Sequence, residues 1–165
     1  MQKSEIRKDY FLNKYVIITP GRAKRPRDIK EETFIKRVGK CDFCPENIEK
    51  KNVIDIINGG KHWRVLSLKN IFPAVTLNNK KAYGIQEVII ETPDHSRELG
   101  ELPEAHIMEV LRMYIRRTRA LEKIKNINYI LCFKNQGSKA GASIVHTHSQ
   151  VFATQMLPPD VRKEF

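Results

Sequence analysis

The sequence predicts an α+β fold, in which one long helix packs on a face of an antiparallel sheet. Two observations lead to this prediction. Apolar residues recur at helical spacing over residues 103–124. Short apolar and β-branched stretches, which favour strands, lie both before and after that helix. Because the strands are grouped on either side of one helix, antiparallel pairing is expected.

The chain has the size of a single domain. Its 165 residues, of which 41% are hydrophobic and 30% charged, fit a globular protein with one core, so we expect one domain over residues 1–165. The sequence starts without the apolar segment of a secretion signal, and its apolar runs are too short to span a membrane. The cytoplasm is therefore the expected location.

The expected strands are short and are bounded by turn residues. They cover residues 5–19 (two strands around a turn at 12–14), 61–70, 84–93, 127–133 and 144–153. Residues 20–28 and 134–143 are predicted loops because glycine, proline and polar residues cluster there. Residues 41–47, "CDFCPEN", form a compact turn.

The predicted helix begins at Pro103, which is tolerated in a first turn because its missing N–H has no partner there. One apolar stripe is expected to face the sheet. It comprises Ile107, Val110, Leu111, Tyr114, Ile115, Thr118 and Leu121.

The formal net charge of +11 predicts an anionic partner, either nucleic acid or a small phosphorylated substrate. A solvated basic surface without a specific partner explains the charge equally well.

The paired cysteines Cys41 and Cys44 predict half of a tetrahedral zinc site, a zinc knuckle near the N-terminus. A redox role for this pair would need a thioredoxin-like βαβ setting, which the region lacks. The other two ligands must come from the five histidines or Cys132, and His95 and His146 are the better candidates. Cys132 lies within an apolar strand, where a buried inert thiol is expected.

The stretch "VHTHSQ" places His146, His148 and Gln150 at alternate positions of a predicted strand. Alternate side chains on a strand share a face. With His146 assigned to the metal, His148 remains as an imidazole that could attack a phosphoryl group and form a covalent intermediate.

Residues suited to holding phosphate surround His148 in the sequence. The preceding loop "NQGSKAGAS" has small residues, which allow backbone N–H groups to approach a phosphate. Uncharged donors come from Asn135, Ser143 and Gln150, and Arg22 and Arg25 could pair with phosphate oxygens.

Taken together, these segments resemble the galactose-1-phosphate uridylyltransferase family of the histidine-triad superfamily. The resemblance covers nearly the whole chain in the family's order, through "EIRKDYFLNKYVIITPGRAKRP", "CDFC", "LKNIFPAV", "EVIIETPDHSREL" and "FKNQGSKAGASIVHTHSQ". It implies a histidine-triad-like fold and a zinc-containing nucleotidyltransferase that works by double displacement. UMP or AMP would move between a nucleoside-diphosphate sugar and a sugar 1-phosphate.

The resemblance also implies roles for individual residues. His148 matches the nucleophile and Gln150 the glutamine that contacts the transferred phosphate. The zinc ligands match Cys41, Cys44, His95 and His146, and the substrate-contacting positions match Arg22, Arg25, Asn70, Phe72, Asn135 and Ser143. Gln150 stands where the hydrolytic branch has a third histidine, so the covalent intermediate is expected to wait for a phosphate acceptor.

Two departures from the family pattern are visible. Thr147 stands where the family usually has proline between the two histidines, and its side chain is expected to face away from the site. The family also contains two related halves, of which this chain matches the first. A homodimer or a complementary second half is therefore expected.

Two other kinds of function are compatible with this sequence. A phosphorylase or hydrolase of nucleoside-diphosphate sugars or dinucleoside polyphosphates would use the same residues with a different acceptor. A non-catalytic zinc module that binds nucleic acid, or serves as a dimer scaffold, is the alternative of another class. Nucleic-acid binding is the weaker reading because it leaves His148 and the "NQGSKAGAS" loop without a role.

Overall fold

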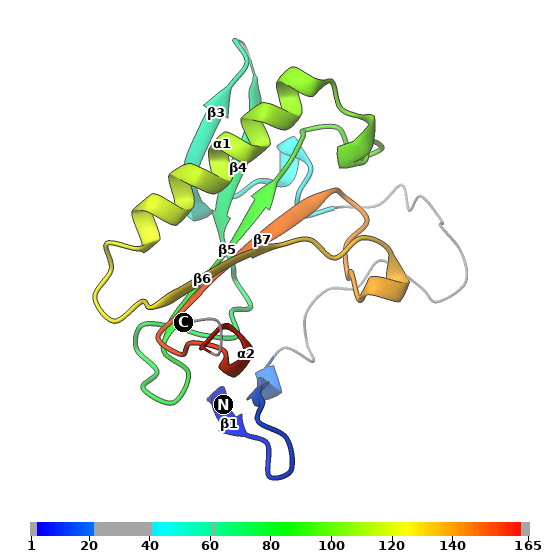
Figure 1. Cartoon of the computed structure of the whole chain (residues 1–165). Coiled ribbons are helices and arrows are strands. Elements are labelled where there is room, and N and C mark those ends of the chain that lie inside the picture. The colour runs from blue at the N-terminus through cyan, green and yellow to red at the C-terminus, as the bar shows by residue number, and fades with distance from the viewer. Residues whose placement is uncertain (1–2, 22–40, 61, 163–165) are drawn as a thin grey trace.

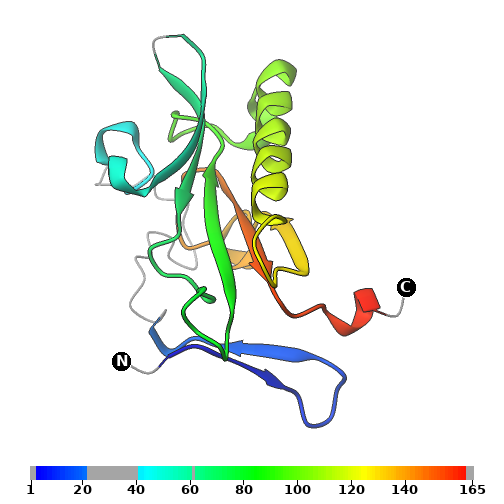
Figure 2. The ribbon, with the colours of Figure 1, turned by 90° about the vertical axis from the view of Figure 1, so that its left-hand side faces the viewer.

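The computed structural model of the chain describes residues 3–21, 41–60 and 62–162. Its main element is a five-stranded antiparallel sheet with the strand order β3-β4-β5-β7-β6 (Figure 1). The strands are β3 (Val53–Asn58), β4 (Trp63–Lys69), β5 (Gly84–Ile90), β6 (Tyr129–Phe133) and β7 (His148–Thr154). A long helix, α1 (Glu104–Leu121), covers one face of this sheet (Figure 2), which confirms the α+β prediction.

Between α1 and the sheet lies the main hydrophobic core. Its fully buried members come from both layers and include Val65, Ile89, Val110, Met113 and Val151. The predicted helix stripe was wrong in part, because Leu111 and Ile115 are 44% and 51% exposed. The sheet contacts a narrower arc of the helix than the apolar residues occupy, so part of the stripe faces outward.

The opposite face of the sheet carries a second, smaller cluster. Leu66, Leu68 and Ile90 pack there against Phe43 and partly buried neighbours from residues 48–63. The segment from Cys41 to Asn52, which contains two turns of 3-10 helix, therefore lies over this face (Figure 2). The predicted turn at residues 41–47, which carries Cys41 and Cys44, thus lies on the face of the sheet opposite to α1.

One predicted strand boundary was wrong, and one strand was missed. The strand expected from residue 144 begins at His148, so His146 and Thr147 precede it. The edge strand β3 was missed, although its burial alternates along Val53–Asn58 as expected for a half-exposed strand. It pairs with β4 as a hairpin across Gly59 and Gly60.

The remaining elements are short. β1 (Glu5–Lys8) and β2 (Tyr15–Ile18) form the predicted hairpin, whose turn is held by Asp9 Oδ1 accepting from the Phe11 and Leu12 N–H groups at 2.8 and 3.0 Å. The 3-10 helices are Pro45–Asn47, Lys50–Asn52, Leu99–Glu101 and Ser138–Ala140, and a short helix α2 spans Pro159–Arg162. No helix among the described residues is long and apolar enough to cross a membrane.

Candidate active site and metal centre

Four potential metal ligands meet where the N-terminal turn lies against the ends of β5 and β7. The donor atoms of Cys41, Cys44, His95 and His146 all lie within 4.8 Å of one another. Cys44 Sγ is 3.4 Å from His95 Nδ1, and both sulfurs lie 3.8–3.9 Å from His146 Nδ1. Ligands on a tetrahedral zinc ion, with Zn–S of about 2.3 Å and Zn–N of about 2.0 Å, are expected at a similar spacing. The geometry therefore fits a tetrahedral metal site.

The hydrogen bonds around the cluster also suit a metal. His146 Nε2 lies 2.8 Å from the carbonyl oxygen of Thr92, so Nε2 carries the proton and Nδ1 directs its lone pair at the sulfurs. Burial lowers the pKa of His146, which favours the neutral imidazole that binds metals. The Cys41 turn is itself braced, since Asn47 Nδ2 donates to the Cys41 carbonyl at 2.8 Å.

His148 begins β7 directly beside this cluster. Its Nδ1 lies 2.8 Å from the carbonyl oxygen of His146, which can only accept, so Nδ1 donates and Nε2 is the unprotonated nitrogen of the neutral ring. The ring meets the Phe43 ring edge to face, with centroids 5.0 Å apart. Phe43 lies between the two cysteines in sequence and was missed as a site residue. Because its ring contacts the His148 ring, the turn that carries Cys41 and Cys44 also helps to orient His148.

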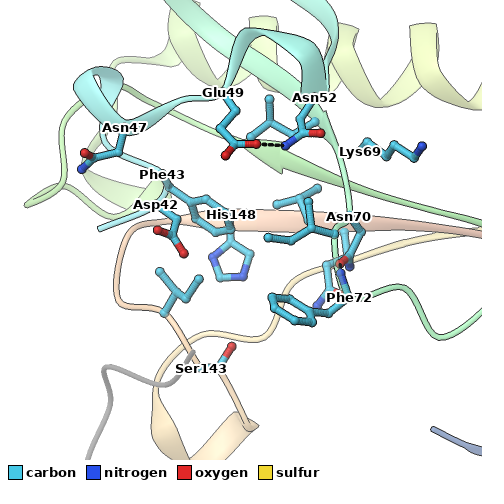
Figure 3. A pocket seen from close by; sticks show the side chains of 15 residues that line it. Asp42, Phe43, Asn47, Glu49, Asn52, Lys69, Asn70, Phe72, Ser143 and His148 are labelled. Atoms are coloured by element: carbon cyan, nitrogen blue, oxygen red, sulfur yellow. Dashed lines mark hydrogen bonds between the residues drawn. The ribbon is translucent and has the colours of Figure 1, made fainter. Parts of the chain in front are cut away.

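A pocket of about 250 Å³ opens in front of His148 (Figure 3). Of the residues expected at the substrate, it is lined by Asn70, Phe72, Ser143, His148 and Gln150. Further lining comes from the N-terminal turns, through Asp42, Phe43, Asn47, Glu49 and Asn52. The loop 134–143 and the segment after β4 thus meet at His148.

The other predicted substrate residues lie elsewhere. Asn135 lines a smaller hollow, and this hollow shares Ile144 and His148 with the main pocket. Arg22 and Arg25 fall outside the described residues. The predicted alternation also holds only in part: His148 and Gln150 line one pocket, whereas His146 is fully buried in the metal cluster.

The side chain of Gln150 is held by a second glutamine. Gln86, on the neighbouring strand β5, is 4% exposed and donates through Nε2 to Gln150 Oε1 at 2.6 Å. Its own Oε1 accepts from the Ala74 N–H at 2.9 Å. The Gln150 carbonyl oxygen is therefore occupied, and its amide N–H groups are the ones available to a ligand.

Residues 64–158 match the family described as "Galactose-1-phosphate uridyl transferase, N-terminal domain", a stretch that makes up more than half of the chain. The chain belongs to the galactose-1-phosphate uridyl transferase family. The resemblance predicted from the motifs is thus confirmed.

Individual relatives of the family agree with this assignment. The chain is 32% identical to the ADP-glucose phosphorylase of Arabidopsis thaliana over 97% of its own length and 51% of that protein. It is 29% identical to the galactose-1-phosphate uridylyltransferase of Thermotoga maritima over 93% of its length and 48% of that protein. The chain therefore spans about half the length of these relatives.

Solved structures of the family have the same fold. The crystal structure of the Arabidopsis thaliana ADP-glucose phosphorylase with bound ADP-glucose superimposes with a TM-score of 0.69 at 32% identity, covering 98% of this chain and 52% of that one. A uridylyltransferase structure superimposes with a TM-score of 0.71 at 32% identity, covering 97% and 48%. Both similarities extend over nearly the whole of the present chain.

Proposed function

We propose that this chain carries the nucleotidyl-transfer site of a family enzyme, as a single domain over residues 1–165. UMP or AMP would pass from a nucleoside-diphosphate sugar to His148, and then to a sugar 1-phosphate. The observation that carries the proposal is the placement of His148: its Nδ1 donates to the His146 carbonyl, and the ring lines a pocket with Gln150 and Ser143.

In the first step, His148 Nε2 forms a bond to the α-phosphorus of the donor. The bond from that phosphorus to the bridging oxygen breaks, and its electron pair leaves with the sugar 1-phosphate. The Nδ1 proton stays on the ring, and its hydrogen bond to the His146 carbonyl stabilises the positive charge that the ring gains. An acceptor phosphate oxygen then attacks the same phosphorus, breaks the N–P bond and restores neutral His148.

The neighbouring residues would bind and orient the nucleotide. Gln150 would donate an amide N–H to a non-bridging phosphate oxygen, because its carbonyl already accepts from Gln86. Asn70 and Phe72 would contact the nucleoside, and Ser143 and Asn135 the phosphates. The Gln150 amide can hydrogen-bond the phosphate but cannot transfer a proton as a general acid, which favours transfer to a phosphate acceptor over hydrolysis.

The Cys41–Cys44–His95–His146 cluster would hold zinc. When bound there, zinc would serve as a structural cross-link between the N-terminal turn and the strand ends. His146 would connect this cross-link to the site, because its carbonyl is the acceptor for His148 Nδ1. Other divalent cations that prefer cysteine and histidine ligands would bind the same four residues. Elemental analysis of the purified protein identifies the bound metal.

A phosphorylase is the second candidate, because the Arabidopsis thaliana relative with 32% identity is named ADP-glucose phosphorylase. The first half-reaction would be unchanged. Inorganic phosphate would then replace the sugar 1-phosphate as acceptor, and the product would be a nucleoside diphosphate. The two candidates therefore differ only in the molecule that attacks nucleotidyl-His148.

Intact-protein mass spectrometry tests the proposal. The chain, loaded with zinc, is mixed without acceptor with UDP-glucose or with ADP-glucose, and the His148→Ala variant serves as control. A mass gain of one UMP or AMP in the wild type and none in the variant supports the mechanism and identifies the base. Addition of galactose 1-phosphate or inorganic phosphate to the adduct then distinguishes a transferase from a phosphorylase.

Absence of an adduct with either donor would contradict this function for the chain as it stands. If the adduct appears only after a second-half polypeptide is supplied, the partner prediction is supported instead. Sedimentation of the chain alone tests the homodimer. Salt-sensitive binding of random-sequence RNA or DNA that survives His148→Ala would favour the non-catalytic alternative.

A further inference from the structure

Behind the catalytic strand, on the side that faces α1, lies a buried carboxylate that the motifs did not single out. Glu91 follows β5 directly and is fully buried. Its Oε1 accepts from Ser149 Oγ and, at 3.2 Å, from the Tyr114 hydroxyl. Its Oε2 accepts from Thr147 Oγ1 at 2.6 Å and from Lys134 Nζ at 2.8 Å. Both oxygens are thus fully engaged.

This carboxylate is ionised. Burial acts to raise the pKa of Glu91, but the hydrogen bonds from Lys134, Ser149 and Thr147 outweigh it and hold the pKa below its ordinary value. A buried anion requires such partners, since an unpaired charge in the interior is costly. Removal of any one donor should therefore disturb the whole group.

The cation of the group reaches the active-site backbone itself. Lys134 stands at the junction of β6 and the loop 134–143, and its side chain is 18% exposed. Besides Glu91, its Nζ contacts Thr147 Oγ1 at 2.5 Å and the His148 carbonyl at 3.4 Å. One ammonium group therefore touches both residues that follow the metal ligand His146.

The network encloses the short segment that connects metal ligand and nucleophile. Thr147 and Ser149 bind Glu91 from either side of His148, and the Glu91 N–H lies 3.4 Å from the Thr147 carbonyl. The next residue after Glu91, Thr92, supplies the carbonyl that orients His146. A shift of Glu91 or Lys134 would thus move the backbone that aims both imidazoles.

We propose that Glu91 and Lys134, acting through the Thr147 hydroxyl, are positioning residues that set the direction of the His148 ring for nucleotidyl transfer. The proposal rests on the proposed function of His148. Lys134 is the first residue of the loop 134–143, and its Nζ contacts the His148 carbonyl, so it would also hold this loop beside the nucleophile. The Thr147 hydroxyl is the contact that joins Glu91 and Lys134 to the segment before His148, and a proline at this position would remove it.

A second ion pair on the same sheet face provides a matched control. Glu87, earlier on β5, accepts from Arg117 at 2.8 and 2.9 Å, and the two side chains are 3% and 12% exposed. This pair joins α1 to the sheet. In the described part of the chain, neither side chain has a hydrogen bond to the backbone of residues 146–149. Arg117→Met therefore reports what the loss of a buried ion pair does to stability alone.

The experiment measures the single-turnover rate of nucleotidyl-His148 formation in the full zinc-loaded chain, with the donor that labels the wild type. Lys134→Met should slow this rate about 10–100-fold, since a small misplacement of a reacting group costs this much. Thr147→Val should slow it about fivefold to tenfold for the same reason, because it removes one hydroxyl at nearly constant volume. Affinity for UMP or AMP, measured by calorimetry, should stay within about twofold in both.

Arg117→Met should lower the melting temperature and leave the rate within about twofold of the wild type. An unchanged rate in folded Lys134→Met and Thr147→Val would overturn the proposal. So would equal slowing by Arg117→Met, because the effect would then be general loss of stability. If Lys134→Met does not fold, Thr147→Val alone decides.

A readout without turnover separates this inference from the proposed function. Long-range nitrogen–proton NMR spectra report which ring nitrogen of His148 is protonated. The wild type should show the Nδ1–H form, and Lys134→Met and Thr147→Val should show a mixture of forms. A wild type that forms no adduct refutes the proposed function; an unchanged ring spectrum in both variants refutes the positioning role.

Discussion

The two sides of β7 differ in what they contribute to this protein. Ser149, Val151 and Ala153 face α1 and are almost completely buried, in the main core or, for Ser149, against Glu91. His148 and Gln150, which alternate with these residues along the strand, are half-buried and line the pocket on the opposite face. We therefore expect substitutions at Val151 and Ala153 to affect mainly stability, and substitutions at His148 and Gln150 to affect mainly the proposed activity.

The largest expected effect comes from His148→Ala. It should abolish formation of the nucleotidyl adduct, because the attacking nitrogen is removed, and should leave the melting temperature nearly unchanged. Intact-protein mass spectrometry and thermal denaturation check the two halves of this prediction. If His148→Ala forms the adduct at the wild-type rate, His148 is not the nucleophile, and the two faces of β7 do not differ as proposed.

Removal of a metal ligand should affect both faces. Cys44→Ala or His95→Ala should reduce the zinc content from about one ion per chain to nearly none and lower the melting temperature, since structural zinc contributes directly to folding. Metal analysis and thermal denaturation measure this. Cys132→Ala is the control, because Cys132 lies on β6 near Thr118 and away from the cluster. Full zinc in Cys44→Ala would show that the ligands were assigned wrongly.

The core face should respond in stability alone. Met113→Ala should reduce the free energy of unfolding by about 2–5 kcal/mol, because a fully buried side chain leaves a cavity. Met108→Ala, at a position 46% exposed on the same helix, should cost less than about 0.5 kcal/mol. Urea denaturation gives both values. Similar losses in the two variants would mean that α1 packs through a different face.

The smallest effect is expected at the glutamine pair behind the pocket. Gln86→Leu should slow adduct formation about tenfold, because Gln150 loses the donor that fixes its amide. Asn128→Ala, which removes an amide that bonds the Gln155 carbonyl elsewhere on the sheet, should leave the rate unchanged. Single-turnover kinetics compare the two. If the variants behave alike, Gln150 does not depend on Gln86.

Much of the site could be predicted because its residues belong to short, chemically distinctive patterns. Cys41 and Cys44 are separated by two residues, and His146, His148 and Gln150 lie at alternate positions. The structure places the four predicted ligands together and sets His148 and Gln150 in one pocket. The start of the last strand could not be predicted, because the apolar residues Ile144 and Val145 favour a strand, whereas the chain bends there and His146 joins the cluster with Cys41 and Cys44.

The missed elements depend on contacts between distant residues. β3 is an edge strand in which Ile54 and Ile56 are exposed while Asp55 is partly buried beside Arg117, so its burial does not follow the apolar pattern of the sequence. Its pairing with β4 decides its conformation. Phe43 contacts His148 through the packing of the Cys41–Cys44 turn on the sheet, a contact that the sequence does not reveal. Glu91 and Lys134 are 43 residues apart, and neither stands out in a sequence with 30 basic and 19 acidic residues.

By itself, the sequence determined the class of fold and the four residues that meet as a possible metal site, and it predicted His148 as the nucleophile, because periodicity, spacing and side-chain type are local properties of the chain. The tertiary structure decided which way those groups point. Orientation depends on buried hydrogen bonds between segments that only folding brings together, such as His146 to Thr92 and Thr147 to Glu91. Water does not replace these hydrogen bonds in the interior, so they hold the side chains in one orientation. The sequence could predict which residues belong to the site but not this orientation.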